Sequence, residues 1–126
     1  MKVLINCSNH PSSIWSNEQR QGWDEIIDVP FPNVPPELDT NDKPYQETIQ
    51  TLWRNIVDIV KSKDEGTIYL HLAGEYSVCY EIFLKAKEWL IPLAVPTTRR
   101  ETAEVKNADG SVTKSSRFEF VRWRIL

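Results

Sequence analysis

Glycine, cysteine and histidine are scarce in this chain of 126 residues, which contains four glycines, two cysteines and two histidines. No GxGxxG pattern or Walker A loop follows the first apolar run, which argues against a dinucleotide-binding or P-loop enzyme. Two cysteines and two histidines without the spacing of metal ligands also argue against a zinc site. The sequence therefore predicts neither a metal nor a cofactor.

Long apolar runs are missing as well. None approaches the roughly 20 residues that span a bilayer, and the segment that starts at Met1 turns polar too early for a signal peptide. We therefore expect a cytoplasmic protein without a membrane partner, in which Cys7 and Cys79 are buried thiols. The length, with 40% hydrophobic and 26% charged residues, predicts a single domain over residues 1–126.

The net charge of −3 argues against a protein that coats long nucleic acids by neutralising their phosphates. The charges are unevenly divided, because residues 1–96 hold eight Lys/Arg against fourteen Asp/Glu, and residues 97–126 hold seven against four. Any positive surface is therefore expected in the last quarter of the chain.

Strand and helix signals alternate along the chain, which predicts an α/β fold with a Rossmann-like, mostly parallel sheet flanked by helices. The expected strands are residues 2–6, 25–31, 67–73 and 91–96. A short helix is expected after Ser16, ending at Gly22. Two longer helices each have one apolar stripe: residues 43–61 with Tyr45, Ile49, Leu52, Ile56 and Val60, and a helix after Gly74 with Val78, Ile82, Ala86 and Trp89.

Beyond Arg100 the pattern becomes that of a C-terminal antiparallel β-hairpin. Its expected arms are residues 103–106 and 118–125, joined by an Asp-Gly turn within residues 107–110. Phe120 and Trp123 have opposite parity in the second arm, so either a bulge lies near residue 120 or both faces of the hairpin are covered. The second alternative would suit a dimer interface.

Polar clusters follow three of the predicted strands: Ser8–Ser13, Gly74-Glu75 and Thr97–Arg100. Because the carboxyl ends of parallel strands lie along one edge of a sheet, and ligands bind in the crevice outside that edge, the three clusters are expected to meet in one pocket.

The first cluster offers the hydroxyls of Ser8, Ser12 and Ser13, the amide of Asn9 and the imidazole of His10. These groups precede a predicted helix N-terminus, where unpaired N–H groups attract phosphate. The alternative is that they only satisfy the turn and the helix cap.

In the second cluster, Gly74 permits close approach of a ligand to the backbone. Glu75 is a candidate partner for a ribose hydroxyl or an acid–base group, and the alternative is a carboxylate that stabilises the first helical turn. His71, inside the preceding strand, is expected to be a hydrogen-bonded core residue that points away from the edge.

The third cluster gives the strongest anion signal, because arginine binds phosphate with two parallel hydrogen bonds and threonine adds neutral donors. Thr97, Thr98, Arg99 and Arg100 are therefore candidate ligand contacts. The alternative is a pair of solvated arginines on an acidic domain.

Four short motifs resemble small stand-alone CRISPR-associated proteins of the CARF (CRISPR-associated Rossmann fold) type over most of the chain. They are Ser8-Asn9-His10-Pro11, Gly74-Glu75, Thr97-Thr98-Arg99 and Phe118-Glu119-Phe120-Val121-Arg122. The resemblance implies a homodimer that binds cyclic oligoadenylate across its two-fold axis in type III CRISPR antiviral signalling, through residues of the first three motifs and Ser12.

Some members of that group, called ring nucleases, also cut the messenger without metal, and the resemblance favours a protein that binds or removes the signal over an effector. Cleavage would be in-line attack by a ribose 2′-hydroxyl, with Arg99 or the residue 8–13 loop stabilising charge and His10 or Glu75 moving protons. His10, Arg99 and Glu75 are thus the candidate catalytic residues. The alternatives are a non-catalytic nucleotide sensor, a protein-interaction module, or an enzyme acting on another nucleotide or a phosphosugar.

Overall fold

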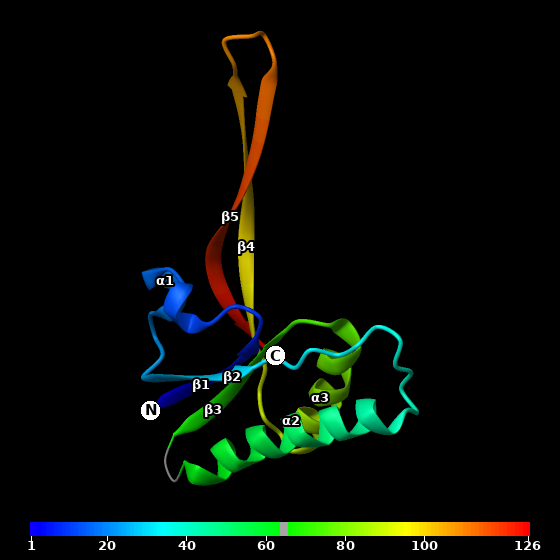
Figure 1. Cartoon of the computed structure of the whole chain (residues 1–126). Helices are drawn as coiled ribbons and strands as arrows, with labels where there is room; N and C mark the ends of the chain where they lie inside the picture. The colour runs from blue at the N-terminus through cyan, green and yellow to red at the C-terminus, as the bar shows by residue number, and fades with distance from the viewer. Residues whose placement is uncertain (64–65) are drawn as a thin grey trace.

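The computed structural model describes residues 1–63 and 66–126 and confirms the predicted mixed α/β fold (Figure 1). Three parallel strands form the central sheet in the order β2 (Glu25–Pro30), β1 (Lys2–Ser8) and β3 (Thr67–Ala73). The register places Asn6 beside Asp28 on one side and beside His71 on the other. The three strands therefore end at the same edge, where the first two polar clusters lie.

Two long helices, α2 (Lys43–Ser62) and α3 (Tyr76–Glu88), cover one face of the sheet (Figure 1). Helix α2 buries its predicted stripe except Val60, which is half-buried. Helix α3 buries its predicted stripe except Trp89, which is exposed. The prediction for Trp89 was wrong because the helix ends at Glu88 and leaves this residue as the C-cap.

The core lies between these helices and the sheet. Strand alternation turns Ile5 and Cys7 of β1 toward α2 and α3, and neither side chain is exposed. Burial raises the pKa of the Cys7 thiol to about 12. Both cysteines are free, as expected, but Cys79 is only half-buried.

The C-terminal hairpin is longer than the sequence predicts. Strand β4 runs without a break from Ala94 to Lys106 and pairs with β5 (Val112–Ile125). A bridge between Leu70 and Leu93 holds the beginning of this arm against β3, and β4 then leaves the sheet. The strand expected at residues 91–96 therefore had the wrong bounds: it begins at Ala94 and continues through Pro96 into the hairpin, because its pairing with β5 extends to Lys106.

The hairpin contains the bulge expected near residue 120. Thr97 pairs with Arg122 and Thr98 pairs with Phe120, which leaves Val121 as the extra residue. This extra residue brings Phe120 and Trp123 to the same face. The Asp-Gly turn is also as predicted, and the arms extend far beyond the sheet as a two-stranded ribbon (Figure 1).

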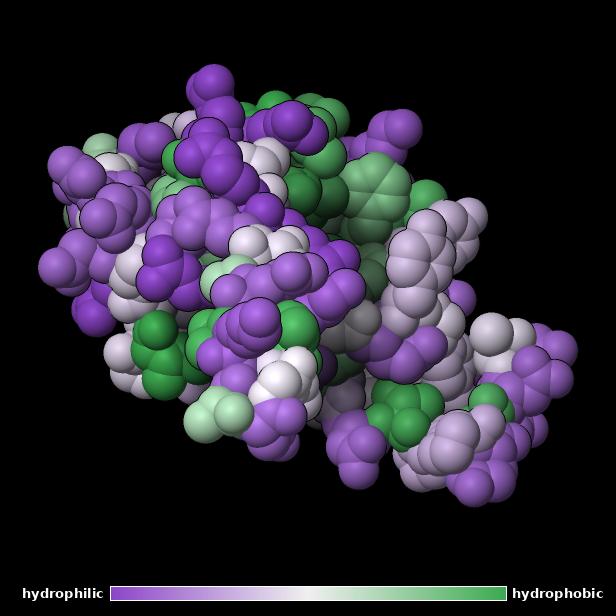
Figure 2. All heavy atoms as spheres, turned by 90° about the horizontal axis from the view of Figure 1, so that it is seen from above, coloured by the Kyte–Doolittle hydropathy of each residue, from purple (hydrophilic) through white to green (hydrophobic). Residues whose placement is uncertain are grey.

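The opposite face of the sheet is thinly covered, by the one-turn helix η1 (Ser12–Ile14), the short helix α1 (Asn17–Arg20) and the base of the hairpin (Figure 1). Ser16 caps α1, as predicted, because its Oγ accepts a hydrogen bond from the backbone N–H of Gln19 at 3.3 Å. Seen from above, the surface is mainly hydrophilic with scattered hydrophobic residues (Figure 2). Among residues 1–63 and 66–126, no helix combines the length and the apolar run that a membrane crossing needs.

Candidate functional site

A cavity of about 720 Å³ lies on the thinly covered face, where the sheet edge meets the base of the hairpin. This volume is in the range of small-molecule sites. Both histidines of the chain, His10 and His71, line it. The other side chains that matter for its chemistry are Trp15, Glu18, Thr98, Arg117, Phe118 and Phe120.

His71 is the least exposed polar residue of this lining, with 6% of its surface accessible. Burial lowers the pKa of its imidazole to about 4; a hydrogen bond to the Ala94 backbone opposes the shift, and nearby His10 adds to it. The ring is therefore neutral at neutral pH. Its Nδ1 is buried and has no hydrogen-bond partner among the described residues.

Aromatic rings surround the imidazole of His71. The rings of Trp15 and Trp123 lie with their centroids 5.9 Å and 5.4 Å from it, both edge to face. Phe120 lies 5.6 Å from Trp123. The indole N–H of Trp123 donates to the backbone carbonyl of Gln19 at 2.9 Å, which fastens the hairpin base to α1. The cavity is thus bounded by rings that packing holds in place.

A polar network that includes the buried residues Asn6 and Ser8 shapes the loop that carries His10. The Asn6 amide donates to the backbone carbonyl of His10 and to the Asp28 carboxylate, both at 2.9 Å. Ser8 Oγ donates to Asn6 Oδ1 at 2.7 Å, and Ser12 donates its hydroxyl to Asp28 at 3.0 Å. The hydroxyls of Ser8 and Ser12 therefore satisfy the hydrogen bonds of the turn, which was the alternative to a ligand contact.

The remaining residues of the first cluster lie outside the main cavity. Asn9 is exposed and lines a smaller hollow between β1 and β2 together with Ser8. Ser13 is exposed and does not line the main cavity. The backbone N–H of Asn9 donates to the carbonyl of Ala73 at 3.2 Å, so the first two clusters do meet at the sheet edge.

Gly74 and Glu75 have structural roles at the beginning of α3. A Cβ at position 74 would lie 2.6 Å from the Phe31 ring, so the close approach that requires glycine is to a side chain of the core. The Glu75 carboxylate caps α3 by accepting from the backbone N–H groups of Ser77 and Val78. Hydrogen bonds from Ser77 and Val78 lower the pKa of this carboxyl, which suits an ionised cap rather than a proton donor.

The third cluster runs along β4 rather than around a loop. Thr98 is the member that lines the cavity with His10. Strand alternation turns Thr97 and Arg99 to the other face of the hairpin, and the Thr97 hydroxyl donates to the Arg122 carbonyl at 3.1 Å. Arg100 has the parity of Thr98 but lies further along the arm and does not line the cavity.

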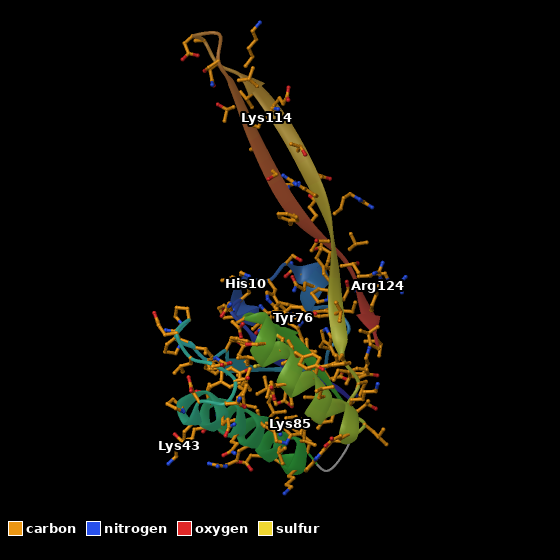
Figure 3. The ribbon with its side chains drawn as sticks, turned by 90° about the vertical axis from the view of Figure 1, so that its right-hand side faces the viewer. His10, Lys43, Tyr76, Lys85, Lys114 and Arg124 are labelled. Carbon is orange, nitrogen blue, oxygen red and sulfur yellow. The ribbon has the colours of Figure 1, made fainter. Side chains whose placement is uncertain are left out.

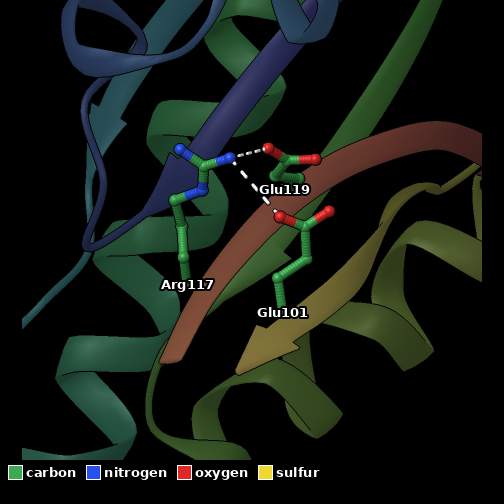
Figure 4. Close-up of polar contacts among 3 residues, drawn as sticks. All are labelled: Glu101, Arg117 and Glu119. Carbon is green, nitrogen blue, oxygen red and sulfur yellow. Dashed lines mark hydrogen bonds and ion pairs between the residues drawn. The ribbon is translucent and has the colours of Figure 1, made fainter. Parts of the chain in front are cut away.

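The cation in the cavity lining is Arg117 rather than Arg99, and it is already paired (Figure 4). Its Nη2 lies 3.4 Å from the Glu101 carboxylate and also contacts the carboxylate of Glu119. All three side chains are largely exposed, so the pairing is weak and screened. The cavity therefore carries little net positive charge.

Sequence reasoning missed His71, Trp15, Phe118 and Phe120 as cavity residues. A signal for His71 was present, because Asn6, Asp28 and His71 are polar residues inside three predicted strands and share one register level. Metal chemistry receives no support, since the described residues contain no group of three His, Cys, Asp or Glu side chains that could hold an ion.

A family model described as the Uncharacterized protein MJ1673 family matches residues 2–124, so the chain belongs to that family. No curated protein and no solved structure matches the chain.

Proposed function

We propose that this member of the MJ1673 family binds an adenine nucleotide in the cavity between the sheet edge and the hairpin base, with cyclic oligoadenylate as the ligand. The observation that carries the proposal is the buried, neutral His71, whose Nδ1 has no partner, set among aromatic rings. Flat bases stack on aromatic side chains with about 1–3 kcal/mol each. An adenine also brings an exocyclic N–H₂ donor, which would pair with this nitrogen once the imidazole turns toward the cavity.

The charge of the site supports recognition through the base more than through phosphate. Arg117 is paired with two carboxylates, and Arg99 does not line the cavity. Phosphate contacts would come from His10 and from Thr98, both exposed at the mouth of the cavity. The choice of a cyclic oligoadenylate rests on the resemblance to CARF proteins.

Isothermal titration calorimetry with cyclic tetra-adenylate, cyclic hexa-adenylate and AMP tests the proposal. His71→Phe keeps an aromatic ring and removes the acceptor, so it should weaken binding by about tenfold or more, the effect of losing one buried hydrogen bond. Arg99→Ala is the control and should bind like the wild type. Absence of binding by all three ligands to the folded protein would overturn the proposal.

The same mixtures, kept with EDTA and analysed by chromatography, separate two forms of the proposal. An intact ring identifies a sensor. A linear product identifies a ring nuclease, and His10→Ala should then abolish product while retaining most of the binding, because His10 is the exposed imidazole at the cavity mouth.

A further inference from the structure

Helix α3 has apolar side chains on both of its faces. Its inner face is fully buried, whereas its outer face carries Tyr76, Tyr80 and Leu84, which are 83%, 54% and 42% exposed. These three residues are spaced by four positions and form one stripe along the helix. A contiguous apolar stripe on the outer side of a surface helix marks a site of interaction.

The other long helix, α2, has no such stripe on its outer face. On α2, the outward positions Arg54, Asn55 and Asp58 are polar, as expected for a helix that faces water. Figure 3 looks onto α3, with Tyr76 at the end of the helix near the hairpin. The described part of the chain places nothing over the stripe, and Leu90, 88% exposed just beyond the helix, adds to the apolar surface.

We propose that the outer face of α3 is a self-association surface, on which the α3 helix of a second copy packs antiparallel about a two-fold axis near Tyr80. The stripe would then pair Tyr80 with its own copy, and Tyr76 with Leu84 of the partner. Such a contact is isologous, because the same patch is used on both sides.

The charges at the two ends of the stripe favour a second copy of the chain as the partner and an antiparallel arrangement of the two α3 helices. Glu75 lies exposed at the N-terminus of α3, and the last turn carries Lys85, Lys87 and Glu88, which leave that end with a net positive charge. Twelve residues of helix separate Glu75 from Lys87 by about 18 Å. An antiparallel pair places each carboxylate opposite the ammonium group of the other copy, whereas a parallel pair would place like charges together.

Sedimentation velocity of the full chain over a range of concentrations tests the proposal. The wild type should form dimers, and Tyr80→Glu should raise the dimer dissociation constant by about 30-fold or more, as for the loss of an interface hot spot. Asn55→Glu adds the same charge to the outer face of α2 and should leave the dimer intact. Circular dichroism verifies that both variants are folded.

A second pair of variants tests the charges. Lys87→Glu should weaken the dimer about threefold or more at low salt, and Lys61→Glu, which alters the last turn of α2 in the same way, should not. Direction is tested by a short bismaleimide in a Cys79→Ser background: Tyr80→Cys should cross-link to its own copy and Tyr76→Cys should not.

A wild type that stays monomeric at every concentration overturns the proposal, and so does a dimer that Tyr80→Glu leaves unchanged. Cross-linking of both cysteine variants with equal yield would refute the antiparallel direction. None of these measurements uses a nucleotide, so the outcome is independent of the proposed ligand.

Discussion

Acid should destabilise this protein mainly through His71. The pKa of this imidazole is about 4 in the folded chain, because it is buried, against 6.5 for an unperturbed histidine. The unfolded state therefore binds one more proton than the folded state between these two values. Stability must fall as the pH falls through 6.5, and the loss must level off near pH 4.

The size of the effect follows from the same two pKa values. Between pH 7 and pH 5 the free energy of unfolding should fall by about 2 kcal/mol, and the complete pKa shift corresponds to about 3 kcal/mol. His71 is 6% exposed, so water screens little of this penalty. With a typical urea m-value of about 1–2 kcal/mol/M, the unfolding midpoint should fall by at least about 1 M.

Urea unfolding at pH 7, 6 and 5 measures this loss in the wild type and in two variants. His71→Gln removes the titrating ring and should flatten the pH dependence by about 2 kcal/mol, although the variant is less stable at pH 7. His10→Gln removes the neighbouring imidazole, which is the smallest of the causes that set the His71 pKa, and should keep most of the dependence of the wild type. Parallel pH dependences for the wild type and His71→Gln would refute the reasoning.

Three further predictions concern the fold. Gly74→Ala should destabilise the protein by about 1–3 kcal/mol in urea unfolding, because the new methyl group collides with the Phe31 ring. Native-state alkylation with iodoacetamide should modify Cys79 well before Cys7, whose buried thiol has its pKa raised to about 12; equal rates would contradict its burial. Replacing residues 103–115 with Asn-Gly, which leaves the pair Thr102 and Ser116 beside the turn, should change the melting temperature by no more than a few degrees, since this ribbon adds nothing to the core; unfolding on truncation would show otherwise.

The regular part of the fold was predictable because hydrophobic periodicity reports burial directly. The stripe of α2 and the inner stripe of α3 follow from their spacing alone, whereas the clash of parity between Phe120 and Trp123 indicated either a bulge or two covered faces, and the strand pairing shows the bulge. The path of β4 was not predictable in the same way. Local patterns do not show whether a chain stops at Pro96 or continues into a hairpin, because only the pairing with β5 decides it.

The position of the candidate site could be predicted from the sequence, but most of the residues that line it could not. The switch-point rule locates the sheet edge, and the structure brings His10 and Thr98 together there. The rule does not show which polar residues have structural roles instead. Ser8 and Ser12 hold a loop, and Glu75 caps a helix. Arg99 lies on the opposite face of β4 from Thr98. His71 looked like a core residue, and its lack of an Nδ1 partner is visible only in three dimensions.

The positions of the proposed ligand site and of the proposed dimer surface determine whether ligand binding and dimer formation are coupled. The cavity and the outer face of α3 lie on opposite faces of the sheet, so a dimer formed through α3 leaves each copy with a complete cavity of its own. We therefore expect one nucleotide ligand per protomer, and equal affinity in the wild type and in Tyr80→Glu. A protein of the CARF type would instead share one ring across its two-fold axis, which would give one ligand per dimer and a loss of affinity on dissociation. Because coupling between sites is reciprocal, a ligand that shifts the dimer dissociation constant in sedimentation would favour the shared ring over independent cavities.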